Sequence, residues 1–307
     1  MNYKSGCVAT VGFFDGVHVG HKFLIEELKT LARERNQRTM IITFIVHPRK
    51  VLNSEFQPQL LNTPEEKAEQ LQSTQVDGII ELEFTREMAQ LTAYEFLHLI
   101  LKHNFNVKTL LVGHDHRFGH NRSEGFQEYK KYGEMLGIEV IQAQPYSTTE
   151  DKNISSSEIR LAVEQGEIER ANRQLGYAYS ITGKVIDGFR MGRKIGFPTA
   201  NLKVINPDKL IPPLGVYAVR VYWNGNVYKG MMNIGTRPTL SNSYHTSLEV
   251  NIFDFSKDIY NQTIKVEFLQ KIRDEQKFNG VDELVEQLKK DREMVEGMNL
   301  NTNNVNK

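Results

Sequence analysis

Residues 8–32 read VATVGFFDGVHVGHKFLIEELKTLA and set the architecture of the first half of the chain. The stretch begins with an apolar run, Val8 to Val11, that is short enough to be a buried strand. Glycines then break any regular period, and from His18 to Ala32 apolar residues recur at helical spacing. The pattern therefore predicts a strand, a glycine-rich turn and a helix.

The entrance of this helix is typical of an anion-binding site. A helix N-terminus offers unpaired backbone N–H groups and the positive end of the helix dipole. Gly12 and Gly16 let a bulky phosphate approach the backbone, and His18 and His21 could donate hydrogen bonds to it. The spacing matches neither the Walker pattern nor GxGxxG, so a glycine-rich turn with merely exposed histidines stays open as an alternative.

Strands and helices alternate over residues 1–178. Apolar runs predict strands at 39–44, 78–82, 109–112 and 138–142, and helices are expected to begin near residues 63, 92, 123 and 154. This alternation predicts an α/β domain with a doubly wound parallel sheet and helices on both faces. Ligands of such sheets bind beyond the carboxyl ends of the strands, where His18, His47 and Asp115 lie.

Short β-rich runs replace the helices beyond residue 178. Asn224-Gly225 separates two such runs and predicts a hairpin, and further strands are expected at 248–253 and 264–269. These features predict a small antiparallel β-barrel domain over 179–297, with a C-terminal helix over 281–295 and a polar tail at 298–307.

Two stretches of the second half carry candidate chemistry. Residues 183–202, GKVIDGFRMGRKIGFPTANL, read as a flexible basic loop that could cover phosphates. In it Thr199 and Asn201 face one side of an extended chain, and their oxygen atoms suit magnesium. Glu249 lies on the opposite face of its strand from its apolar neighbours. An ordinary Pro-Thr turn and a solvent-facing glutamate are the alternatives.

The overall composition limits the classes of function. The 38 basic and 38 acidic residues balance, so no global field favours nucleic acid or a membrane surface as partner. The single cysteine, Cys7, excludes an intrachain disulfide and a cysteine-based zinc cluster. The start of the chain lacks a secretory signal, and no segment approaches the ~20 apolar residues that span a bilayer. We expect a cytoplasmic protein that acts on a small molecule; its oligomeric state is open.

The motifs of the first half resemble those of a known family. GFFDGVHVGH closely resembles the HxGH signature of adenylyl-transferring nucleotidyltransferases, in the form that bacterial FAD synthetases have. Residues 113–119 resemble their GxDFRFG segment, with His116 in place of Phe, and residues 155–160 resemble their SSTxxR motif. Where that family commonly has FDPHP, this chain has Ile45 and Val46 before His47. The resemblance implies that His18 and His21 are catalytic and that ATP or its phosphates contact Gly12, Phe13, Asp15, Gly16, His47, Asp115, Ser155, Ser157 and Arg160.

The second half is similar to riboflavin kinase from about Ile181 to Val295. The shared segments are PTAN, PxGVY, MNIGTRPT and LEV before a DF dipeptide, in the same order. The resemblance implies that Thr199 and Asn201 hold Mg²⁺ with ATP and that Glu249 is the catalytic base. It also implies that ATP or flavin contacts Gly183, Gly192, Arg193, Pro198, Asn233, Arg273 and Phe278.

Together the two resemblances imply a bifunctional enzyme that converts riboflavin to FMN and FMN to FAD. ATP would be the co-substrate of both steps, and FMN and FAD would be substrate and product rather than redox cofactors. Two alternatives remain. One is a riboflavin kinase whose adenylyl site is weakened by Ile45 and Val46. The other is a non-catalytic flavin-binding regulator, against which the presence of Glu249 argues, because a sensor needs no base.

Overall fold

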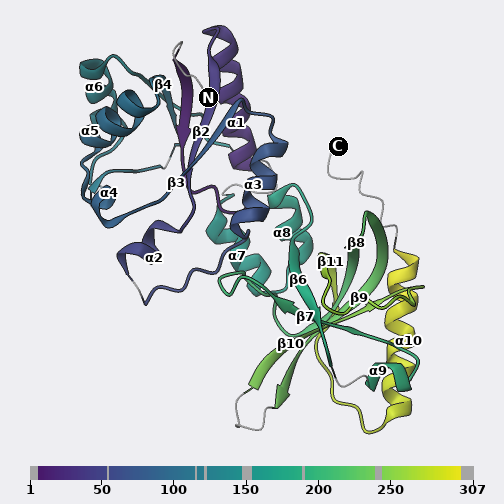
Figure 1. Cartoon of the computed structure of the whole chain (residues 1–307). Helices are drawn as coiled ribbons and strands as arrows, with labels where there is room; N and C mark the ends of the chain where they lie inside the picture. Colours follow the sequence, from purple (N-terminus) through teal and green to yellow (C-terminus); the bar gives the residue numbers. More distant parts are fainter. Residues whose placement is uncertain are drawn as a thin grey trace. The chain divides into compact units, whose positions relative to one another are not determined.

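The computed structural model describes residues 6–53, 55–114, 116–120, 123–146, 154–188, 191–238 and 244–298. The chain forms two compact units, Met1–Ser156 and Ser157–Lys307. Each has its own sheet, as Figure 1 shows. Among the helices that the structure describes, none combines the length and the apolar character that crossing a bilayer requires.

The first unit is built around a five-stranded parallel sheet with the strand order β3-β2-β1-β4-β5. Its strands are β1 (Cys7–Val11), β2 (Arg38–Phe44), β3 (Gly78–Leu82), β4 (Val107–Val112) and β5 (Glu139–Gln142). Its helices are α1 (Val19–Glu34), α2 (Pro48–Leu52), α3 (Pro64–Ser73), α4 (Arg86–Gln90), α5 (Ala93–Glu95) with its π-helical continuation η1 (Phe96–Asn104), and α6 (Phe126–Leu136). The predicted doubly wound parallel sheet is confirmed.

Two apolar clusters cover the two faces of this sheet. One contains Ile25, Leu28 and Ala32 of α1, whose spacing of three and four residues puts them on one side of the helix. The other cluster contains side chains of η1 and α6, among them Leu97 and Tyr129. Full burial of one such side chain contributes roughly 1.5–3 kcal/mol, so packing of these faces holds the layers together.

The predicted helix starts agree with the structure where a capping box marks them. Thr63 and Glu66 form both bonds of the box at the start of α3, and Thr92 and Glu95 do so at α5. Other details were wrong. The helix expected from residue 123 begins at Phe126, and α2 and α4 were not predicted at all. Pro48 does end the ladder of β2, but it also occupies the first position of α2.

The second unit begins with two helices, α7 (Ser156–Glu164) and α8 (Ile168–Leu175). Asn172 of α8 connects them to the strands that follow. Its Nδ2 donates to the carbonyl of Phe268 at 2.9 Å, and its Oδ1 accepts from the N–H of Tyr179 at 2.7 Å. Helix α8 therefore packs with the strands of the second unit, and the domain boundary between residues 178 and 179 stays a prediction.

Six antiparallel strands close into a barrel with the order β10-β7-β6-β11-β8-β9. They are β6 (Ser180–Ile186), β7 (Ala200–Val204), β8 (Gly215–Trp223), β9 (Asn226–Pro238), β10 (Tyr244–Ile252) and β11 (Thr263–Arg273). Tyr217 and Phe268 are fully buried and meet edge to face at 5.3 Å. The C-terminal helix α10 (Val281–Gly297) packs through Val295 on a cluster that includes Val216 and Met231. The predicted barrel and helix are confirmed.

The predicted flexible loop over residues 183–202 was wrong at both ends. β6 continues to Ile186, β7 begins at Ala200, and a short helix, α9 (Met191–Lys194), lies between them. Gly183 belongs to the barrel wall, where an added Cβ would lie 2.7 Å from Cγ of Leu202. Close packing of two strands, rather than loop freedom, explains a glycine at this position.

Candidate active sites

A strained turn connects β1 to α1 in the first unit. Phe14 and Val17 have φ angles of 55° and 35°, in the left-handed region that non-glycine residues rarely adopt, and Gly16 has a φ of 81°. Such residues cost about 1–3 kcal/mol each and persist only where their surroundings hold them. Here the buried carboxylate of Asp15 accepts hydrogen bonds from the backbone N–H groups of Leu61 at 3.0 Å and Asn62 at 3.2 Å.

The helix entrance that follows holds both predicted histidines. His18 is the N-cap of α1, and its Nδ1 accepts the backbone N–H of His21 at 3.3 Å. The two imidazole rings stack, with centroids 3.6 Å apart and planes 19° apart. When the ring of His18 is neutral, an accepting Nδ1 leaves the proton on Nε2, which is then a hydrogen-bond donor.

Burial lowers the pKa of His21 well below its usual range, and His18 and His116 lower it further by charge repulsion. His21 is therefore neutral at physiological pH. It can donate or accept a hydrogen bond at this site but carries no positive charge there. The attraction for an anion at this entrance comes instead from the backbone amides and the dipole of α1.

A cavity of about 740 Å³ opens in front of this entrance. Its volume is within the usual range of small-molecule sites, about 300–1,000 Å³. Of the predicted residues it is lined by Gly12, Phe13, His18, His21 and Ser155. His114, His116 and Tyr146 also line it. The structure thus brings together the HxGH stretch and Ser155, which is more than 130 residues later in the chain.

The other residues predicted for this site lie elsewhere. Asp15 does not line the cavity; its carboxylate holds the backbone of Leu61 and Asn62, a structural role that the sequence analysis missed. His47 caps α2 through its Nδ1, and its ring meets the edge of Phe13 at 4.7 Å. Ser157 and Arg160 belong to the second unit, and Asp115 is outside the described residues. The phosphate-binding roles of these residues stay predictions.

The predicted base of the barrel unit lies in the middle of a row of polar residues. Glu249 on β10 is directly opposite Asn201 on β7 and Asn233 on β9. Directly opposed residues of antiparallel strands point to the same face, with Cβ atoms about 4.5–5.5 Å apart. Thr199 joins this row, because its Oγ1 donates to Oε2 of Glu249 at 3.1 Å. The structure therefore brings together Thr199, Asn201, Asn233 and Glu249.

Two further contacts fix the PTAN segment against β10. Nδ2 of Asn251 donates to the carbonyl oxygen of Pro198 at 2.6 Å, while its buried Oδ1 has no hydrogen-bond partner among the described residues. Gly188 lies so close to Asn201 that an added Cβ would overlap its carboxamide. Neither residue was predicted as a site residue from the sequence. Asn251 could have been found, because it shares a face of β10 with Glu249, whereas nothing in the sequence pointed to Gly188.

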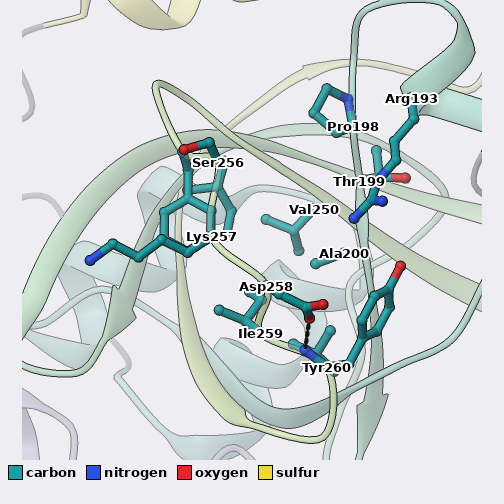
Figure 2. A pocket seen from close by; sticks show the side chains of 13 residues that line it. Arg193, Pro198, Thr199, Ala200, Val250, Ser256, Lys257, Asp258, Ile259 and Tyr260 are labelled. Atoms are coloured by element: carbon teal, nitrogen blue, oxygen red, sulfur yellow. Dashed lines mark hydrogen bonds between the residues drawn. The ribbon is translucent and has the colours of Figure 1, made fainter.

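A pocket of about 390 Å³ opens beside the PTAN segment. Figure 2 shows Arg193, Pro198 and Thr199 on one side of this pocket and Ser256 and Lys257 on the other. Asp258 and Tyr260 also line it, and Oδ1 of Asp258 accepts the backbone N–H of Tyr260 at 3.1 Å. Two cationic side chains at one pocket suit a phosphate-bearing ligand.

The donor atoms around Glu249 are of the kind that Mg²⁺ takes. A hydroxyl (Thr199), a carboxamide (Asn201) and a carboxylate (Glu249) are hard oxygen ligands, and Mg²⁺ commonly adds water and substrate phosphate to one or two of them. The orphan Oδ1 of Asn251 adds a fourth oxygen two residues from Glu249. In the described ranges no group of three or more His, Cys, Asp or Glu residues is arranged to hold a metal. The oxygen atoms of Thr199, Asn201 and Glu249 thus fit a magnesium ion that is bound together with a nucleotide.

Arg273 holds the C-terminal helix. Its Nε and Nη2 donate to the carboxylate of Asp291 on α10, a residue that is 2% exposed, and the guanidinium lies 5.8 Å from the ring of Phe278. Gly192 has a structural role as well: the backbone of Phe197 packs against its Cα, and its carbonyl accepts the N–H of Phe197 at 2.8 Å. The flavin-side roles predicted for Arg273 and Phe278 stay predictions.

Comparison with known proteins matches the two halves of the chain to two family models. A family model for FAD synthetase matches residues 1–158, and a model for riboflavin kinase matches residues 175–298. The bifunctional riboflavin kinase/FMN adenylyltransferase of Listeria monocytogenes is 39% identical over 289 residues, which cover 93% of this chain and 90% of that protein. The protein of the same name from Bacillus subtilis is 38% identical over 293 residues, with coverage of 93% and 90%.

A crystal structure of a Streptococcus pneumoniae protein, described there as a macrolide-efflux protein, has the same fold. It superposes with a TM-score of 0.88 and 34% sequence identity, over 97% of this chain and 96% of that one. The two family models cover separate units, and the relatives match across both of them. The chain therefore belongs to the family of bifunctional riboflavin kinases/FMN adenylyltransferases.

Proposed function

We propose that the barrel unit phosphorylates riboflavin to FMN and that the first unit adenylylates FMN to FAD, each with ATP. The observation that carries this proposal is the hydrogen bond between Thr199 and Glu249 within the row Asn201–Glu249–Asn233. It places a carboxylate beside oxygen donors that suit a metal–nucleotide complex. Membership of the family supports both activities.

In the barrel unit, Glu249 would accept the proton of the riboflavin 5′-hydroxyl while this oxygen attacks the γ-phosphorus of ATP. A positioned general base contributes about 10²–10⁴-fold to such a reaction. Thr199 and Asn201 would hold Mg²⁺, which when bound neutralises the phosphate oxygens of ATP. Arg193 and Lys257, which line the adjoining pocket, would bind the nucleotide phosphates.

The adenylyl transfer needs no nucleophile from the protein. The phosphate of FMN attacks the α-phosphorus of ATP, and pyrophosphate leaves. The chain has to stabilise the charge that develops on the phosphate oxygens. The amides at the start of α1, the imidazoles of His18 and His21 and the hydroxyl of Ser155 would do so. Ile45 and Val46 do not line this cavity.

The two assignments are tested by variants that should separate the two activities. Glu249→Gln keeps an acceptor for Thr199 but removes the base, so FMN formation should fall about 10²–10⁴-fold. FAD formation from supplied FMN should stay at the level of the wild type. His21→Ala should have the reverse effect. Both products are measured by chromatography after incubation with ATP and Mg²⁺.

Three outcomes would contradict the proposal. Loss of both activities from either variant in a folded protein would show that the two sites are wrongly assigned. A wild-type protein that makes FMN but no FAD would support the kinase-only alternative. Binding of riboflavin without turnover would support the regulator. The cytoplasmic location and the absence of nucleic-acid and membrane partners stay predictions.

A further inference from the structure

A lysine is buried at the carboxyl edge of the parallel sheet. Lys67 of α3 is 3% exposed, and lysine is rarely buried to this extent unless its charge is paired. Its ammonium donates to the carbonyl oxygen of Phe44 at 2.6 Å and lies 4.3 Å from the centroid of the Phe13 ring. A longer contact of 3.4 Å reaches Oγ1 of Thr43. Lys67 therefore contacts the end of β2 and the turn after β1 at the same time.

These contacts continue into the nucleotide cavity of the first unit. Oγ1 of Thr43 donates to the carbonyl oxygen of Phe13 at 3.1 Å, and the N–H of Gly12 donates to the carbonyl of Ile42 at 3.0 Å. Phe13 is one of the residues that line the cavity, and its ring also meets the ring of His47. Lys67 does not line the cavity. Any effect that it has on substrate must pass through Phe13 and the end of β2.

The burial of this charge is costly. It lowers the pKa of the Lys67 ammonium to about 8, although the carboxylates of Glu81 and Asp15 act in the opposite direction. Replacement of a buried ionic group by an apolar one of similar size is often neutral for stability or even stabilising. Stability alone is therefore a weak reason for a lysine at position 67. The contacts of Lys67 with Phe13 and Phe44 indicate a functional reason.

We propose that Lys67 is a positioning residue for adenylyl transfer, which fixes Phe13 and the end of β2 in the shape that the nucleotide cavity requires. This inference rests on the proposed adenylyltransferase function of the first unit. A cation over the Phe13 ring restricts the ring, and the Lys67 bond to Phe44 fixes the backbone that leads to His47. Small misplacements of such elements are expensive, since about 1 Å can cost 10²-fold in rate.

The test compares Lys67→Met with the wild type in both reactions of the same chain. We expect kcat for FAD formation from FMN and ATP to fall about ten- to a hundredfold, while FMN formation from riboflavin stays within about twofold. A Lys67→Met protein whose kcat and KM for FAD formation both equal those of the wild type would overturn the proposal. A wild-type protein that makes no FAD would instead refute the function on which the proposal rests.

Asp77→Asn is the matched control, because Asp77 contacts the amino-terminal end of β2, whereas Lys67 contacts its carboxyl end. The Asp77 carboxylate accepts the N–H of Thr39 at 2.8 Å and its Oγ1 at 2.7 Å. This variant should lower the stability of the first unit and leave kcat for FAD formation unchanged. An equal loss of kcat in Asp77→Asn and Lys67→Met would show that Lys67 acts only through stability, and would overturn the proposal.

Thr43→Val keeps the test decisive if Lys67→Met fails to fold. Thr43 is fully buried, and valine preserves its shape while removing the hydroxyl between Lys67 and Phe13. We expect a smaller fall in kcat for FAD formation, with FMN formation unchanged. Kinetics of Thr43→Val that equal those of the wild type would argue against positioning through this hydroxyl and would overturn the proposal.

Discussion

Replacement of Asp291 by alanine should strongly destabilise the barrel unit. The Asp291 carboxylate accepts three N–H contacts from Arg273, at 3.1, 3.0 and 2.8 Å, and a fourth from Gln287 at 2.8 Å. The Asp291 side chain is 2% exposed and that of Arg273 is 14% exposed. Removal of one partner of a buried ion pair lowers the free energy of unfolding by about 3–5 kcal/mol. Because Arg273 is partly exposed, we expect a loss at the lower end of this range.

The single tryptophan of the chain, Trp223, makes this change easy to follow, because it lies in β8 of the barrel. A loss of about 3 kcal/mol is a large part of the 5–15 kcal/mol that stabilises a typical domain. With a urea dependence of about 2 kcal/mol per molar, the midpoint of the Trp223 fluorescence transition should fall by about 1.5 M.

Asp254→Asn is the matched control, because it removes the charge of an exposed partner of the same helix and asparagine tolerates the positive φ of 53° at this position. Asp254 pairs with Arg292 of α10 at 3.0 Å, but its side chain is 87% exposed. Exposed pairs contribute little to stability, so this variant should leave the midpoint almost unchanged. A midpoint for Asp291→Ala that lies close to that of Asp254→Asn would refute the argument that burial of the Arg273–Asp291 pair holds α10 in place.

Three further predictions follow from single residues. The pKa of His21 is lowered in the folded chain, so at pH values below the ordinary histidine pKa of 6.5 the unfolded chain binds more protons than the folded chain. The free energy of unfolding of the first unit should therefore fall as the pH is lowered through 6.5. Urea titrations of the wild type and of His21→Phe at several pH values measure this fall. Burial raises the pKa of the Cys7 thiol to about 11, so a thiol reagent at pH 8 should label the protein only when the first unit unfolds, as measured by mass spectrometry in urea. Gly188→Ala should displace the Asn201 carboxamide and abolish most FMN formation without affecting FAD formation from FMN, which a chromatographic assay of both products would show.

Local signals in the sequence predicted much of the fold. The capping boxes at Thr63 and Thr92, the Asn224-Gly225 turn and the buried runs of the parallel sheet all act over a few residues, and the structure has each of them. No comparable local signal exists for Gly183. The stretch that begins at Gly183 holds four glycines and several basic residues and reads as a loop. Only the pairing of Gly183 with β7 and β11 shows that it is part of the barrel wall.

The candidate sites were predictable in their residue types but not in their contacts. That Glu249 would face Asn201 and Asn233 depends on the register of three strands, which no local pattern encodes. Lys67 follows two glutamates in the first turn of a helix and reads as an ordinary exposed residue. Its burial results from the packing of α3 over the ends of β1 and β2, which is a tertiary effect.

Strands β7 and β10 of the barrel meet at residues of the proposed kinase site. In the described part of the chain, β7 and β10 pair at Glu249–Asn201 and Val250–Ala200 alone, whereas β9 and β10 pair from Tyr244 to Ile252. Opening of the barrel should therefore begin at this short seam, where the fewest backbone bonds must break. A nucleotide and metal held by Thr199, Asn201 and Glu249 would bridge the seam and slow amide hydrogen exchange along β7. Binding of the substrate complex would then stabilise the pairing of β7 with β10, and an intact β7–β10 pair would in turn favour binding.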